Sequence, residues 1–252
     1  MNDYDPDQLK SLTSSVWRFK MGEMVSMMIH LGDRLGLYKA LDGKGAVSAP
    51  EFAAQTGYQE RWLLEWLRGQ TAAGLLNYHH PDQFELSEEG AMLLAREDEG
   101  TWFAAGAFSG PLDTATLDKL ADAFTTGVGL SYEELGPVAA HRTERMLGPW
   151  VKEQLVPEII PALDGVAEKL KAGALAADVG CGGGIALTTM ADAFPNSTFH
   201  GYDPNSHAIE NLKGKCRDQN LGNVDAFVAR GEDLPVEAKY DFIITRSGNG
   251  IS

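Results

Sequence analysis

The chain has 252 residues, 44% hydrophobic and 23% charged, which is the balance of an ordinary globular protein with a buried core. Its formal charge is −15, and so acidic a surface repels phosphate backbones and anionic lipids, which argues against nucleic-acid and membrane partners. Two cysteines cannot form a disulfide framework, no apolar run approaches the ~18 residues of a membrane helix, and the chain starts with MNDYDPDQLK, unlike a secretory signal. We expect a cytoplasmic protein.

The first 13 residues are polar and expected to fray. Over residues 14–41 apolar side chains recur at three- and four-residue steps, which predicts a helix with an apolar face. Its methionines could line a flexible pocket, but packing in the core is favoured because methionine fills gaps well. The predicted apolar face consists of Val16, Phe19, Met24, Met27, Met28, Ile29, Leu31 and Leu35.

Residues 48–96 follow the order of a winged helix-turn-helix unit. Ser48 and Glu51 predict a capping box at the start of a helix over residues 50–55. A second helix is predicted over residues 59–73. Its large apolar side chains recur at i,i+4 and should face a core or a dimer partner; they are Trp62, Leu63, Trp66 and Leu67.

Two short strands, residues 75–78 and 84–86, predict the hairpin of a wing, and Ser87 should begin the next helix. This architecture invites a DNA-binding interpretation. However, residues 48–96 carry seven acids and three bases, a net charge of −4, whereas a DNA reader normally presents a basic face. We therefore expect this unit to pack or dimerise and not to bind nucleic acid. The histidines and cysteines lack the four-ligand spacing of structural zinc, so no metal is expected.

The sequence predicts three regions. Residues 1–96 form a helical and winged-helix domain, residues 97–170 a helical connector, and residues 171–252 a nucleotide-binding domain. Glycines and prolines, Pro149 among them, are expected to interrupt the connector helices. Its aromatic side chains could form one wall of a substrate pocket or pack the two flanking regions together.

The most informative stretch, residues 174–184, reads Ala-Leu-Ala-Ala-Asp-Val-Gly-Cys-Gly-Gly-Gly. It predicts a buried strand that ends near Asp178, a glycine-rich turn, and then a helix over residues 185–194. Strand, glycine turn and helix form the first unit of a nucleotide-binding α/β fold. The dinucleotide fingerprint G-x-G-x-x-G/A fails in both registers, because Ile185 or Leu187 occupies its last small position.

This stretch resembles motif I of the class I S-adenosylmethionine-dependent methyltransferases, an acidic residue, any residue and then G-x-G-x-G. Asp178, Gly180, Gly182 and Gly184 fit that pattern. The resemblance extends over nearly the whole chain to bacterial methyltransferases with an N-terminal winged-helix region. It implies S-adenosyl-L-methionine as the cofactor, a small-molecule acceptor, and a loop that wraps the amino-acid end of the cofactor. Cys181 is expected to have no covalent role.

Two acidic positions further along agree with the resemblance. A strand over residues 198–202 runs into Asp203, 25 residues after Asp178, close to the ~20-residue spacing of a ribose-binding carboxylate. The alternative for Asp203 is a helix-capping acid before Ser206. A third strand, residues 224–229, leads to a turn where the family places an acid for the adenine amino group.

Asp233 is the better adenine candidate of that turn. The fourth family strand matches residues 240–245, whose carboxyl end should face the cofactor. The complete set of cofactor-binding residues that the resemblance implies is Asp178, Gly180, Cys181, Gly182, Gly184, Asp203, Pro204, Glu232, Asp233 and Thr245.

The implied fold is an α/β Rossmann-like methyltransferase core preceded by a mainly α-helical winged-helix domain. The family sheet has seven strands, of which strands 1–4 are found before Ser252, so residues 240–245 should form the edge of an incomplete sheet. No catalytic residue can be carried over. The first hypothesis is a truncated methyltransferase that transfers methyl to a small molecule by in-line displacement, with a homodimer as an option. The alternatives are a cofactor-binding or interaction protein without turnover and, third, a winged-helix transcription factor.

Overall fold

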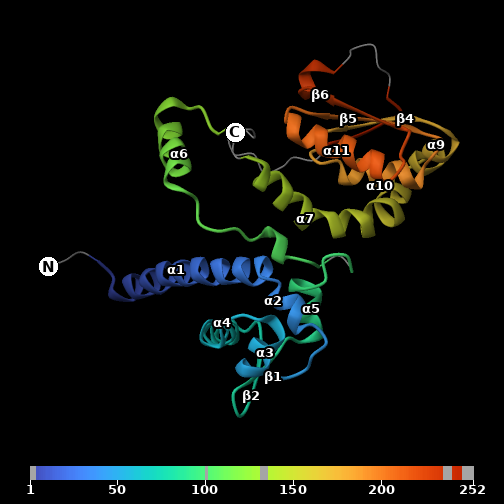
Figure 1. The fold of residues 1–252 in the computed structure, drawn as a ribbon. Coiled ribbons are helices and arrows are strands. Elements are labelled where there is room, and N and C mark those ends of the chain that lie inside the picture. The colour runs from blue at the N-terminus through green and yellow to red at the C-terminus, as the bar shows by residue number, and fades with distance from the viewer. Residues whose placement is uncertain (1–3, 100–101, 131–135, 235–239, 246–252) are drawn as a thin grey trace. The chain divides into compact units, whose positions relative to one another are not determined.

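The structure is a computed structural model, and Figure 1 shows its fold. It describes residues 4–99, 102–130, 136–234 and 240–245. The chain divides into two compact units, the first comprising Met1–Glu97 with Phe103–Pro111 and the second Asp98–Trp102 with Leu112–Ser252. None of the described helices has both the length and the apolar character needed to cross a membrane. The domain boundaries predicted at residues 96 and 170 stay predictions.

The first unit is a winged helix-turn-helix. Its helices are α1 (Pro6–Arg34), α2 (Leu37–Leu41), α3 (Ala49–Thr56), α4 (Glu60–Ala72), α5 (Glu88–Leu94) and the 3-10 turn η1 (Ala105–Ala107). Its strands are β1 (Val47–Ser48), β2 (Asn77–His79) and β3 (Gln83–Glu85), antiparallel in the order β1-β3-β2. The predicted wing is confirmed, whereas β1 was missed because two residues are too short for an alternating pattern.

The predicted helix starts of this unit are confirmed by their caps. The Ser48 hydroxyl accepts from the Glu51 amide at 3.5 Å while the Glu51 carboxylate accepts from the Ser48 amide at 2.8 Å, a complete capping box. The Ser87 hydroxyl accepts from the Gly90 amide at 3.1 Å at the start of α5. Large aromatic side chains, including Tyr38 and Phe52, fill the core between these helices and the sheet.

The α4 prediction is correct for three of its four apolar side chains. Leu63, Trp66 and Leu67 are buried, but Trp62 is 75% exposed and does not face the core of its own chain, so for Trp62 only the dimer alternative stays a prediction. At 100° per residue, the buried positions 63, 66, 67 and Gln70 centre on one stripe, and Trp62 lies about 90° from that centre.

Three predictions for the region of α1 and α2 are wrong. Helix α1 begins at Pro6, because the Asp5 carboxylate accepts from the Asp7 amide at 2.9 Å, so residues 6–13 are helical and not frayed; residues 1–3 lie outside the described residues. Gly36, at φ 69°, separates α1 from α2. The predicted core face contacts the core only near its carboxyl end, at Ile29 and Met28. The members that are instead exposed are Val16, Phe19, Met24, Met27 and Leu35.

The second unit is a parallel α/β domain. Its strands are β4 (Leu175–Val179), β5 (Thr198–Asp203), β6 (Val224–Val228) and β7 (Phe242–Thr245), in the order β6-β5-β4-β7. Its helical segments are α6 (Thr114–Thr126), α7 (Gly136–Gln154), the π-helical η2 (Leu155–Ile159), α8 (Ile160–Ala162), α9 (Val166–Ala172), α10 (Ile185–Ala193), α11 (Ser206–Asp218) and the 3-10 turn η3 (Gly231–Asp233). The Rossmann-like prediction is confirmed, and β7 is an edge of the described sheet.

Helix α7 corrects one predicted interruption. Pro149 lies inside α7 and does not end it. Gly148, next to Pro149, and the buried Val151 face the hydrophobic core of the second unit. A Cβ added at Gly148 would lie 3.8 Å from the Ile185 side chain of α10. This packing stabilises α7 by more than the loss of the backbone hydrogen bond that proline cannot donate.

The two faces of the sheet differ. Helices α10 and α11 cover one face, packing on apolar residues such as Phe199 (Figure 1). Alternate residues on the opposite face include His200 and Tyr202, and Tyr240 links them: its hydroxyl lies 2.9 Å from His200 Nδ1 and 2.7 Å from Tyr202 Oη. Burial raises the pKa of Tyr240. Phe227 stacks on Tyr202 with ring centroids 5.2 Å apart.

Candidate cofactor site

Strand β4 carries small residues into a fully buried acid. Ala176, Ala177 and Asp178 lie between β5 and β7, with Asp178 in register with Gly201 and Ile244. A Cβ at Gly201 would lie 2.9 Å from the Leu187 side chain, so only glycine lets β5 approach the helix behind it. The predicted motif acid therefore sits beneath the loop that follows β4.

Residues 180–184, the glycine loop, use their glycines in different ways. Gly180, Gly182 and Gly184 have φ of 79°, 54° and 79°, values that favour glycine. A Cβ at Gly184 would overlap the buried side chain of Leu212 in α11, whereas a Cβ at Gly182 would meet nothing within 4 Å. The loop is thus packed on one side and open at Gly182.

The loop backbone is bound to β5. The Gly180 and Cys181 amides donate to the Tyr202 carbonyl at 2.8 and 3.1 Å. The Gly182 amide donates to Asp203 Oδ2 at 2.8 Å. The predicted ribose acid and the predicted loop therefore form one hydrogen-bonded unit.

Asp203 does not cap α11. Its Oδ1 accepts from the Asn205 amide at 2.9 Å, and the Asn205 side chain caps the helix by accepting from the Ala208 amide at 3.2 Å. The capping alternative for Asp203 is therefore wrong. Pro204, between these two residues, is exposed.

Two charged residues that the sequence did not single out also meet the loop. Lys215 Nζ of α11 donates to the Gly183 carbonyl at 3.0 Å and forms an ion pair with Glu144 of α7. Burial lowers the pKa of Lys215. Glu144 and Lys215 are 71 residues apart in the chain, so no local pattern could have paired them.

The remaining predicted residues gather at the same end of the sheet. A Cβ at Gly231 would lie 3.2 Å from Val179 Cγ1, which places η3, with exposed Glu232 and Asp233, beside the end of β4. Asp233 Oδ2 accepts from the Arg230 amide at 3.2 Å. Thr245 pairs with Val179 at the end of β7. Carboxyl ends of parallel strands are where α/β sheets bind ligands.

Cys181 faces the protein interior. It is buried, and a Cβ at Gly201 would lie 3.1 Å from its Sγ. A thiol in this position packs against the sheet and is not presented to a ligand above the loop.

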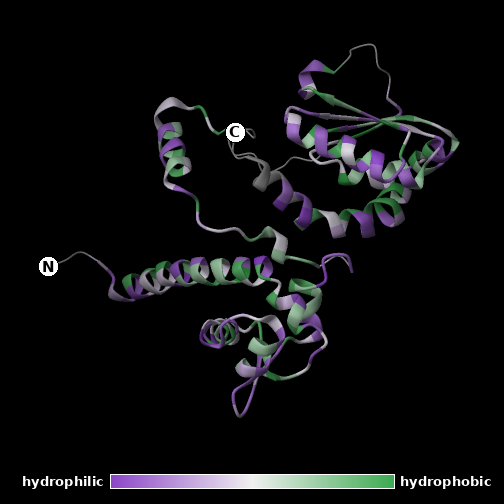
Figure 2. Cartoon of the chain, viewed as in Figure 1, coloured by the Kyte–Doolittle hydropathy of each residue, from purple (hydrophilic) through white to green (hydrophobic). Residues whose placement is uncertain are grey.

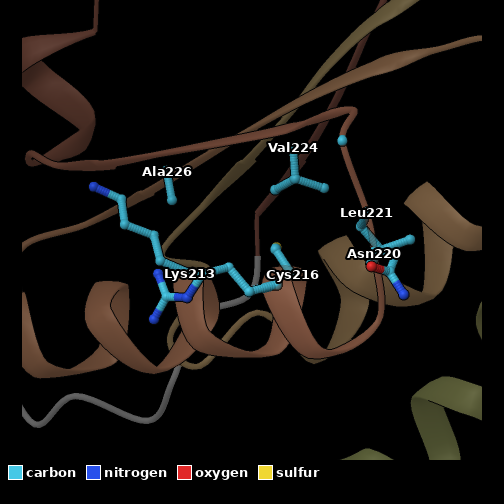
Figure 3. Close-up of a pocket in the computed structure, with 8 residues that line it drawn as sticks. Lys213, Cys216, Asn220, Leu221, Val224 and Ala226 are labelled. Carbon is cyan, nitrogen blue, oxygen red and sulfur yellow. The ribbon is translucent and has the colours of Figure 1, made fainter.

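A cavity of about 570 Å³ lies elsewhere, between α11 and β6 (Figure 3). Lys213, Cys216 and Asn220 line it on the helix side, and Val224 and Ala226 on the strand side. Val224 begins β6, so this cavity lies toward the amino ends of the strands. The glycine loop follows a carboxyl end, and the two sites are therefore distinct.

Comparisons with known proteins agree with this geometry. Residues 176–249 match the family described as "Methyltransferase domain", and residues 23–96 match the "Rv2258c-like winged HTH domain". Residues 176–249 therefore carry a methyltransferase domain, and residues 23–96 carry a winged helix-turn-helix domain. S-adenosylmethionine is the cofactor that the resemblance of the glycine loop to motif I implies. No curated protein matches it.

Solved structures share the fold of this chain at low sequence identity. Mitomycin 7-O-methyltransferase superposes with a TM-score of 0.67 and 20% identity, over 97% of this chain and 73% of that one. A putative O-methyltransferase from Nostoc punctiforme gives 0.65 and 16%, over 96% and 70%. Human N-acetylserotonin methyltransferase, solved with S-adenosylmethionine, gives 0.62 and 17%, over 97% and 72%.

The site residues fit the cofactor chemically. The open side at Gly182 admits a ligand close to the backbone, because no Cβ stands there. Carboxylates at Asp203 and η3 are acceptors for hydroxyl and amino groups, which ribose and adenine present. Helix α10 begins at Ile185, and its N-cap Gly184 offers no side-chain cap, so its first amides are not taken up by a cap of its own.

Proposed function

We propose that this chain holds S-adenosylmethionine against the glycine loop, with its ribose on Asp203 and its adenine beside Asp233 and Glu232. The carrying observation is the 2.8 Å hydrogen bond from the Gly182 amide to Asp203 Oδ2. This bond connects the carboxylate that is proposed to bind the ribose with the loop backbone that is proposed to bind the amino-acid end of the cofactor. Asp178, Gly180, Gly184, Pro204 and Thr245 complete the proposed site, and Cys181 contributes only its backbone, because its thiol faces the interior.

The cofactor, when bound, supplies a methyl group on a positively charged sulfur. A nucleophile can bond to the methyl carbon while the sulfur leaves with its electron pair. The protein's own part is to bind and orient. The hydrogen-bonded loop fixes the backbone around Gly182, and Asp203 fixes the ribose, so the reacting ends need little further ordering. The acceptor in this proposal is a small molecule with a hydroxyl group, as suggested by the O-methyltransferases that share the fold.

Calorimetric titration with S-adenosylmethionine tests the cofactor placement. Asp203→Ala removes at least one charge-assisted hydrogen bond, worth about 1.5–3 kcal/mol, and should weaken binding at least about tenfold. Asp192→Ala, which removes an exposed carboxylate from α10 of the same unit, is the matched control. Equal affinity of Asp203→Ala and wild type would exclude the ribose assignment.

Methyl transfer to a panel of small phenols and alcohols then tests turnover. Formation of S-adenosylhomocysteine that depends on the acceptor supports the proposed methyltransferase activity. Cofactor binding with no transfer to any acceptor favours the alternative, a binding protein without turnover.

A homodimer through α1 is the second part of the proposal. Eight large apolar side chains of this helix are between 39% and 76% exposed, and hydrophobic residues recur along it (Figure 2). Burying each side chain at an interface would stabilise the dimer by roughly 1.5–3 kcal/mol. The 29 residues of α1 span about 44 Å, and a second copy of the chain offers an apolar surface of the same length. The eight are Leu9, Leu12, Val16, Trp17, Phe19, Met21, Met24 and Met27.

Light scattering tests the dimer. Phe19→Glu should convert a dimer into a monomer, whereas Phe124→Glu, at a 94% exposed position of α6, should not. A wild-type monomer at micromolar concentration would exclude the dimer.

The winged-helix unit is not proposed to bind DNA. Its second helix carries Arg61 and Arg68, and both already pair with acids: Arg61 with Glu65 at 2.9 Å and Arg68 with Asp82 at 3.5 Å. Neither cation is then available to neutralise phosphate without losing its partner. A salt-dependent shift of random duplex DNA at 50 mM salt would contradict this. The cytoplasmic location stays a prediction.

A further inference from the structure

Gly183 is the one glycine of the loop that the family pattern does not require. Its backbone is not left-handed, so conformational freedom does not explain it. A Cβ at this position would lie 2.6 Å from Glu144 Oε2 and 3.4 Å from Lys215 Nζ. A side chain at position 183 would displace the Glu144 carboxylate, because an ion pair packs directly on the loop backbone.

The ion pair comes from two helices of the same unit. Glu144 belongs to α7, Lys215 to α11, and their side chains are only 22% and 29% exposed. Lys215 also donates to the Gly183 carbonyl at 3.0 Å. A partly buried charge pair of this kind is costly to break, because either partner alone would be left without compensation.

The contact completes the anchoring of the loop. Residues 180–182 are held through their amides by β5, at the Tyr202 carbonyl and Asp203. Gly183 is held through its carbonyl by Lys215, from the helix layer. Leu212, one helical turn before Lys215, fills the space beside Gly184.

We propose that Glu144 and Lys215 are positioning residues that fix the glycine loop in its cofactor-binding conformation through the Gly183 carbonyl, and so couple α7 to the cofactor site. This inference rests on the proposed function for its effect on binding. Its effect on the loop itself does not depend on any ligand. Lys215 and Glu144 are not catalytic residues, because they act on the cofactor through the loop backbone.

Hydrogen exchange of the ligand-free protein is the first test. Lys215→Met should accelerate exchange in a peptide that covers residues 180–185, with little change elsewhere in the sheet. Lys213→Met is the matched control, because Lys213 lies on the same helix at the α11–β6 cavity (Figure 3). Unchanged exchange in the loop peptide of Lys215→Met would overturn the proposal, whether or not the protein binds S-adenosylmethionine.

Titration with S-adenosylmethionine is the second test. Lys215→Met and Glu144→Gln should each weaken binding by about tenfold, and the double variant should be no weaker than the worse single one. Lys215→Arg should recover most of the affinity, and Glu153→Gln, an exposed acid of α7, should be neutral. Wild-type affinity in both single variants would overturn the coupling. Failure of the wild type itself to bind would refute the proposed function while the exchange result still decides the contact.

Discussion

Helices α3 and α10 both follow a strand, but their first turns are built in opposite ways. Ser48 and Glu51 close the start of α3 with a reciprocal capping box, so its end amides are used within the helix. Helix α10 starts at Ile185, and its N-cap is Gly184, the last residue of the glycine loop, which offers no side-chain cap. The comparison teaches that a helix start completed by its own side chains serves stability, whereas one left open beside an anchored loop serves a ligand.

Gly184→Val should have the largest effect. The new side chain would overlap the buried Leu212 and would also strain a backbone at φ 79°, so we expect a loss of about 4 kcal/mol in the free energy of unfolding. Urea denaturation measures this. A loss below about 1 kcal/mol would show that α11 does not pack on the loop as described.

Gly182→Ala should separate folding from binding. The methyl group would meet no protein atom within 4 Å, so the stability cost is the backbone strain alone, about 1–2 kcal/mol. Affinity for S-adenosylmethionine should fall by about tenfold or more, because the methyl group enters the space proposed for the cofactor. Retained affinity in a folded Gly182→Ala protein would move the cofactor away from this position.

Ser48→Ala should show the reverse behaviour at the other helix start. Loss of the capping box should cost about 1 kcal/mol of stability and leave affinity for S-adenosylmethionine unchanged. Ser206→Ala is the matched control, because Asn205 supplies the cap of α11. A change in cofactor affinity for Ser48→Ala would mean that the comparison between the two helix starts does not hold.

The first unit should also show a dependence of its stability on acid pH. Arg96 makes two hydrogen bonds to Asp42, at 2.9 and 2.8 Å, and they hold the pKa of that carboxyl below its usual range. Because the pKa is lower in the folded state, the contribution is present at neutral pH and disappears as the pH falls below about 4. Arg96→Met should therefore lower the free energy of unfolding at pH 7 and lower it by less at pH 2.5. Equal losses at both pH values in urea denaturation would contradict this.

The sequence predicted those parts of the fold that local patterns specify. Motif I placed Asp178 and the loop correctly, and the capping box placed α3, because both are signals of a few adjacent residues. The contact of Asp203 with the Gly182 amide and the Lys215–Glu144 pair depend on packing between distant segments, which spacing along the chain does not encode.

Exposure was the other failure of prediction. The three- and four-residue spacing of apolar side chains predicted a core face for α1, but such spacing does not tell whether those side chains meet the chain's own core or a partner. Only the carboxyl end of α1 packs on the core of its unit, at Ile29 and its neighbours. The residue-level cofactor contacts themselves stay predictions.

The smallest effect is expected at Trp62, where α4 itself offers a comparison. Trp62→Gln should change the free energy of unfolding by no more than about 0.5 kcal/mol, because the side chain is 75% exposed. Trp66→Phe, four residues on, should cost more than about 1 kcal/mol, because the buried indole donates to the Met28 carbonyl at 3.0 Å. Acrylamide quenching of tryptophan fluorescence checks exposure directly: Trp62→Gln should remove quenchable emission and Trp66→Phe should not. If Trp62 is protected in the dimer and quenched in the Phe19→Glu monomer, the interface extends from α1 onto α4. A large loss of stability for Trp62→Gln in that monomer would place Trp62 in the core after all.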